Sequence, residues 1–79
     1  ALALLNNDLV FRLADTLAER AHRETAQDQQ AQIAWIVKHT LGREPEPQEL
    51  QQALQFSREF GLPAWCRVLL NSNEFVYIR

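Results

Sequence analysis

The sequence predicts an all-α fold: a compact bundle of four helices with short connections and short apolar segments at both ends. Apolar residues recur at helical spacing in long stretches that are almost free of turn residues. The residues that break helices fall into two clusters, Gly42, Pro45 and Pro47, then Gly61 and Pro63. With 79 residues, 47% of them hydrophobic and 23% charged, the chain is expected to form a single helical domain over residues 1–79.

The first helix is expected to follow a short apolar run, residues 1–5. Asn6, Asn7 and Asp8 offer three successive capping side chains, so the helix should begin there. At about 100° per residue, one broad face is apolar and the opposite face is charged. The apolar face comprises Val10, Phe11, Leu13, Ala14, Leu17, Ala18 and Ala21. We expect this face to be buried.

The second helix is expected to begin near Asp28, whose carboxylate can cap free backbone amides, and to end at Gly42. Its apolar stripe is Ile33, Ile36, Val37, Thr40 and Leu41. Trp35 lies off this stripe. It therefore either packs against a second neighbour within the domain or presents its ring to a partner outside it.

Two further helices should follow an extended linker, residues 43–47. Pro47 suits the first position of the third helix, whose apolar side is Leu50, Ala53, Leu54, Phe56, Ser57 and Phe60. Gly61 should end that helix and Pro63 should restart the chain as a fourth one. Apolar residues cover most of the circumference of the fourth helix: Leu62, Trp65, Cys66, Val68, Leu69 and Leu70. This pattern predicts that the fourth helix is the most buried.

A polar string, residues 71–74, separates the fourth helix from an apolar tail, residues 75–78. Amide and hydroxyl side chains beside a buried helix either hydrogen-bond the backbone as a helix stop or contact a ligand. We expect this apolar tail to pack against another part of the protein or against a partner. The candidate interaction residues are Trp35, Asn71, Asn73, Glu74, Phe75 and Tyr77.

Charge and cysteine content disfavour several classes of protein. A net charge of −2 without a dense basic face disfavours nucleic-acid binding, and no apolar run has the length for membrane insertion. The single cysteine, Cys66, forms no internal disulfide and no multi-cysteine zinc site. It also lacks the Cys-x-x-Cys-His pattern of covalent haem attachment. We therefore predict no cofactor, metal or catalytic residue in this segment.

Two other groups of residues have a structural and a chemical interpretation. Glu44, Glu46 and Glu49 surround the linker prolines, where they either offset the dipole of the third helix or form an acid–base or cation site. We favour the first. His22 and His39 fall on separate predicted helices, which favours solvated side chains over a shared metal site.

Three segments carry a family resemblance. Residues 1–7 read Ala-Leu-Ala-Leu-Leu-Asn-Asn, residues 41–45 read Leu-Gly-Arg-Glu-Pro, and residues 66–75 run from Cys66 to Phe75 through Asn-Ser-Asn-Glu. Together they resemble the carboxy-terminal domain of unknown function of large planctomycete proteins that often carry a cytochrome-c-like domain. The resemblance implies that the chain is the carboxy-terminal fragment of a larger bacterial protein, and that this parent is extracytoplasmic, either periplasmic or on the cell surface. The resemblance does not imply any particular enzymatic reaction.

Two functions remain open on the sequence. In the first, the chain is a non-catalytic helical module that packs against and stabilises the rest of its parent protein, so its partner is that remainder or another protein. In the alternative, Asn71, Asn73 and Glu74 complete a ligand or active site of an upstream enzymatic domain.

Overall fold

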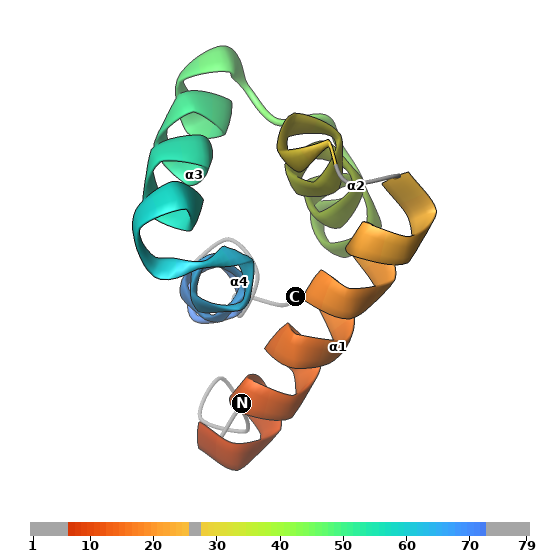
Figure 1. Cartoon of the computed structure of the whole chain (residues 1–79), viewed down its shortest axis with the longest axis vertical. Coiled ribbons are helices and arrows are strands. Elements are labelled where there is room, and N and C mark those ends of the chain that lie inside the picture. The colour runs from red at the N-terminus through yellow and green to blue at the C-terminus, as the bar shows by residue number, and fades with distance from the viewer. Residues whose placement is uncertain (1–6, 26–27, 73–79) are drawn as a thin grey trace.

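The computed structural model describes residues 7–25 and 28–72, and in these ranges it is all-α (Figure 1). The helices are α1 (Asn7–Thr25), α2 (Gln29–Leu41), α3 (Pro47–Phe60) and α4 (Leu62–Leu70). Each helix packs on the next one along the chain, and α4 returns to make the most extensive contact, with α1. The predicted bundle of four helices is confirmed, and its packing closes a ring of helices around one core.

The two ends of α2 follow the local rules of helix capping. The carboxylate of Asp28 accepts a hydrogen bond from the backbone N–H of Gln30 at 3.1 Å. At the other end, Gly42 adopts a left-handed conformation, with φ 76°, and its N–H donates to the carbonyl of Lys38. Glycine adopts this conformation at little cost because it has no Cβ. The predicted start of α2 near Asp28 and its predicted end at Gly42 are both confirmed.

The α3–α4 junction consists of one residue. Gly61 has φ 96° and ψ 152°, and its N–H donates to the carbonyl of Ser57 at 2.8 Å, at the end of α3. Its own carbonyl accepts from the N–H of Trp65 at 3.2 Å, at the start of α4. The chain therefore changes direction sharply, so that α4 is viewed end-on in Figure 1 while α3 lies in the plane of the picture.

The core lies where all four helices meet. Its buried hydrophobic residues are Val10, Ala14, Ala18, Ala21, Ile33, Ile36, Val37, Ala53, Trp65, Cys66, Leu69 and Leu70. α1 contributes mainly alanines, which let its neighbours approach closely. Four of the nine residues of α4 are buried, the highest share of any helix, which confirms the prediction for the fourth helix.

The buried faces are narrower than the sequence pattern predicts. Phe11 is 52% and Leu13 37% exposed, so the prediction that both lie on the buried face of the first helix is wrong. Each lies at one edge of that face, beyond the line of Val10, Ala14 and Ala18 that α2 and α4 cover. Phe60, on the predicted apolar side of α3, and Val68, in the predicted apolar circumference of α4, are 59% and 51% exposed.

Candidate functional site

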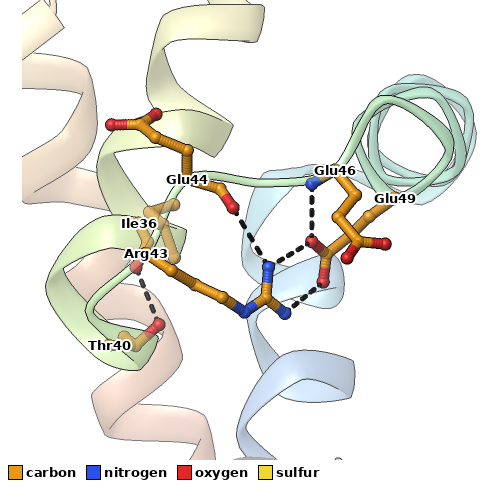
Figure 2. Close-up of polar contacts among 6 residues, drawn as sticks. All are labelled: Ile36, Thr40, Arg43, Glu44, Glu46 and Glu49. Carbon is orange, nitrogen blue, oxygen red and sulfur yellow. Dashed lines mark hydrogen bonds and ion pairs between the residues drawn. The ribbon is translucent and has the colours of Figure 1, made fainter.

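Arg43, in the α2–α3 linker, is the centre of a hydrogen-bonded cluster with Glu49 in the first turn of α3 and with the linker backbone (Figure 2). The guanidinium group of Arg43 donates to both carboxylate oxygens of Glu49, at 2.9 and 3.1 Å. It also donates to the backbone carbonyl of Glu44 at 3.1 Å. The N–H of Glu46, the residue that precedes α3, donates to Glu49 at 3.1 Å. One carboxylate therefore joins the linker to the first turn of α3.

The electrostatics of this cluster favour the structural interpretation of the carboxylates. The hydrogen bond from Arg43 lowers the pKa of Glu49, the N–H of Glu46 adds to the effect, and partial burial opposes it. Glu44 instead faces Lys38, with 3.7 Å between the amine and the carboxylate, and both side chains are exposed. Glu49 is thus a carboxylate held in its charged form by local donors, as expected at a helix N-terminus.

Trp35 packs at the junction of α1 and α2. Its side chain is half-buried against the core, and its ring stacks on His39 with 4.0 Å between the ring centroids. The guanidinium carbon of Arg20, on α1, lies 5.6 Å from the ring centroid. These contacts agree with the interpretation in which Trp35 packs against a second neighbour within the domain. Its contact with a partner stays a prediction.

The histidines and the cysteine have separate surroundings. His22 lies 3.2 Å from the side-chain amide of Gln32, whereas His39 Nδ1 lies 2.8 Å from the carbonyl of Trp35. Across residues 7–25 and 28–72, no three His, Cys, Asp or Glu side chains group together as metal ligands would. Cys66 is fully buried, and burial raises the pKa of its thiol to about 12. It therefore packs as a small apolar side chain.

Asn71 ends α4 through its own side chain. Its amide nitrogen Nδ2 donates to the carbonyl of Arg67 at 3.0 Å, and its backbone N–H donates to the same carbonyl at 3.1 Å. The N–H of Ser72 then donates to the carbonyl of Leu69 at 3.0 Å. Asn71 thus makes the hydrogen bonds expected of a helix stop. Asn73, Glu74, Phe75 and Tyr77 lie outside the described residues, so the predictions made for them stay predictions.

The structure adds a feature that the sequence interpretation missed, an apolar face across α1, α3 and α4. We define the apolar face as the side chains of Phe11, Phe56, Phe60 and Val68. The rings of Phe56 and Phe60 lie 4.7 Å apart, and Phe56 and Val68 both line two neighbouring grooves. Apolar residues surround most of α4, but this pattern does not indicate which of them stays exposed, so only the packing of the helices reveals the apolar face.

The first of these grooves, the α1/α4 groove, has a volume of about 650 Å³. Its lining is mainly apolar and comprises Val10, Phe11, Phe56, Ala64, Arg67 and Val68, with Asn71 and Ser72 at one end. The guanidinium carbon of Arg67 lies 4.7 Å from the centroid of the Phe11 ring. The groove therefore combines an apolar lining with one cation over an aromatic ring.

The second groove, the α3/α4 groove, measures about 330 Å³ and is also mainly apolar. Trp65 and Leu69 line it together with Ala53, while Glu49 and Gln52 supply its polar groups. Ser72 lines both grooves. The two grooves therefore adjoin each other, with Phe56 and Val68 lining both.

No helix among residues 7–25 and 28–72 combines the length and apolar character that crossing a bilayer requires.

Comparison with known proteins places the chain in a family. Searches of curated proteins and of solved structures found no significant match. A family model described as a protein of unknown function matches residues 1–57, which include α1, α2 and most of α3. The match contains two of the three segments that carry the resemblance, residues 1–7 and 41–45, and stops before the third, residues 66–75. The chain therefore belongs to the PSD1 family of proteins of unknown function (DUF1553).

Proposed function

We propose that this chain is a non-catalytic helical module that packs against, and stabilises, the rest of a larger extracytoplasmic bacterial protein. The observation that carries the proposal is the apolar face, in which Phe11, Phe60 and Val68 are each more than half exposed. Full burial of one such side chain is worth roughly 1.5 to 3 kcal/mol. Several large apolar side chains in a contiguous surface are typical of a protein–protein contact.

The state of the polar groups supports a structural role. Arg43 and the N–H of Glu46 hold the carboxylate of Glu49, and the thiol of Cys66 is buried with a raised pKa. The side-chain amide of Asn71 is engaged with the end of α4. These groups serve the fold, whereas the apolar face offers surface to a partner.

The proposal also concerns the identity of the parent protein. The family match supports one part of the resemblance, namely membership of a family of unknown function. We further propose that the parent is one of the large planctomycete proteins that often carry a cytochrome-c-like domain, and that residues 1–79 form its carboxy-terminal domain. The partner of the apolar face is then the remainder of the same polypeptide.

The test compares the isolated chain with and without the remaining parent protein, produced separately. We expect the partner to raise the midpoint of thermal unfolding of the chain by several degrees, because a ligand that binds the folded state stabilises it. The same addition should lower the fluorescence of an apolar dye bound to the chain. Phe60→Gln should weaken both effects.

Leu13→Gln is the matched control, since Leu13 is also an exposed apolar residue but lies outside the apolar face. It should leave both effects unchanged. If saturating partner changes neither the unfolding midpoint nor the dye signal, the proposal is wrong.

A further inference from the structure

Two charges of opposite sign flank the apolar face at Phe56. Arg67, partly exposed on α4, lines the α1/α4 groove together with Phe56. Glu59, exposed on α3, lines a further groove with the same Phe56 and with Gln52 and Gln55. Phe56 therefore lies between a cation on one side and a carboxylate on the other.

Neither charge has a counter-charge of its own. The ion pairs found among residues 7–25 and 28–72 include neither Arg67 nor Glu59. Arg67 contacts the ring of Phe11, which leaves its positive charge uncompensated. Glu49, which lines the α3/α4 groove, is by contrast held by Arg43. The charges that border the apolar face are thus open to a partner.

We propose that the apolar face pairs with the same face of a second copy of this chain, with Arg67 of each copy beside Glu59 of the other. In a two-fold symmetric pair the same surface serves both partners, so a contact between two different residues is made twice. A cation and a carboxylate on either side of a central aromatic ring make the face complementary to itself across a two-fold axis beside Phe56.

The exposed apolar side chains fit the same arrangement. Phe11 lies at the Arg67 end of the face, with 4.7 Å between the guanidinium carbon and the ring centroid. Phe60 packs on Phe56 and does not line the α1/α4 groove. In the pair, Phe11 of one copy approaches Phe60 of the other. Both rings are more than half exposed in the single chain, so pairing removes apolar surface from water.

The size of the apolar face favours weak, reversible pairing. Four side chains from three helices make a small contact, in which the charges set the register more than the affinity. The pairing goes beyond the proposed function, and the two associations exclude each other on a given chain because both use the apolar face. It is measured without the parent protein, so its failure and that of the proposed function are distinguishable.

Sedimentation equilibrium of the 79-residue chain measures the pairing. We expect the dimer fraction to rise between about 10 µM and about 1 mM, the range of a small, transient interface. Glu59→Arg should weaken dimerisation at least about tenfold, because it places two cations together at both ends of the interface. Its fold should be retained, since a cation in the last turn of α3 favours the helix dipole.

Exchange of the two charges tests the pairing of specific residues. Arg67→Glu should weaken dimerisation as Glu59→Arg does, and the double variant should recover the wild-type affinity within about threefold. Arg67→Glu also loses the contact with the Phe11 ring, so circular dichroism verifies its fold. If that variant unfolds, Glu59→Arg decides alone. Leu13→Gln, outside the apolar face, is the control and should leave dimerisation unchanged.

Four outcomes would each overturn the proposal. The first is a chain that stays monomeric up to about 1 mM, as it would if its own ends covered the face. The second is a dimer that Glu59→Arg leaves intact, and the third is a folded double variant that does not recover affinity. The fourth is a dimer that persists when the remaining parent protein is bound, because pairing would then use another surface.

Discussion

At the scale of single residues, Glu49 connects the α2–α3 linker to the first turn of α3. Its carboxylate accepts from Arg43 and from the N–H of Glu46, both at about 3 Å. We expect Glu49→Gln to lower the free energy of unfolding by up to about 1 kcal/mol, because the charge of a partly exposed ion pair is lost while the amide oxygen can still accept from the N–H of Glu46. Urea denaturation at neutral pH measures this change. Glu59→Gln, at an exposed position on the same helix, is the control.

The same residue gives a pH dependence of defined sign. Because Arg43 lowers the pKa of Glu49 in the folded state, Glu49 stabilises the fold above its unfolded pKa of about 4.3. This contribution is lost as the pH falls through the lower, folded-state pKa. The difference in free energy of unfolding between the wild type and Glu49→Gln should therefore be constant above about pH 5 and shrink below about pH 4. A difference that grows on acidification would contradict this account.

Cys66 should be chemically silent while the protein is folded. Its side chain is fully buried, and a thiol with a pKa of about 12 contributes almost no thiolate at neutral pH. We expect a thiol reagent such as Ellman's to react with Cys66 only as fast as the protein opens, and rapidly in concentrated urea. Absorbance of the released product measures both rates. Immediate reaction under native conditions would show that Cys66 is accessible.

At the scale of elements, the two glycines at helix ends differ in the backbone conformation that they require. Gly42 is in the left-handed helical region, whereas Gly61, at φ 96° and ψ 152°, is near a region that is almost exclusive to glycine. A Cβ would meet nothing within 4 Å at Gly42 and only Pro63 at 3.8 Å at Gly61, so space is not the limit at either site.

Conformation should therefore decide the cost of substitution. We expect Gly42→Ala to lower the free energy of unfolding by about 1 kcal/mol, and Gly42→Asn by less, because asparagine tolerates the left-handed region. Gly61→Ala should cost more, up to about 3 kcal/mol. Urea denaturation ranks the three variants. An equal cost for alanine at both positions would contradict the conformational argument.

The helix ends were predictable because they obey local rules. Asp28, Gly42, Pro47 and Gly61 each mark a boundary through the conformation or hydrogen bond of one residue. Which residues at the edge of a face are covered depends instead on how closely the neighbouring helices approach, and periodicity contains no such information. Phe11 and Val68 lie at such edges, so their exposure could be found only from the packing.

The candidate site was only partly predictable for the same kind of reason. The linker carboxylates are visible in the sequence, but the bond between Arg43 and Glu49 spans six positions and depends on how the linker bends between them. The α1/α4 groove depends on contacts between α1 and α4, which are distant along the chain. The residue types of the apolar tail were readable, whereas its place of contact is a question of tertiary structure.

At the scale of the whole molecule, α4 holds the ring of helices together. It packs on α3, its neighbour in sequence, and on α1, the most distant helix along the chain. A domain of 79 residues has only a few kcal/mol of net stability. Loss of packing in α4 should therefore affect all four helices at once, because no pair of the remaining helices encloses a core of its own.

Two aliphatic positions on α4, Leu70 and Val68, test this cooperativity. Leu70 is 2% exposed, so Leu70→Ala should cost about 2 to 5 kcal/mol through lost burial and a residual cavity, and should leave much of the chain unfolded at 25 °C. Val68→Ala, on the same helix but more than half exposed, should change the free energy of unfolding by less than about 0.5 kcal/mol. Far-UV circular dichroism through urea titrations measures both. If Leu70→Ala melted α4 while the signal from the other helices persisted, the ring would not be the cooperative unit; a single transition at lower urea would show that it is.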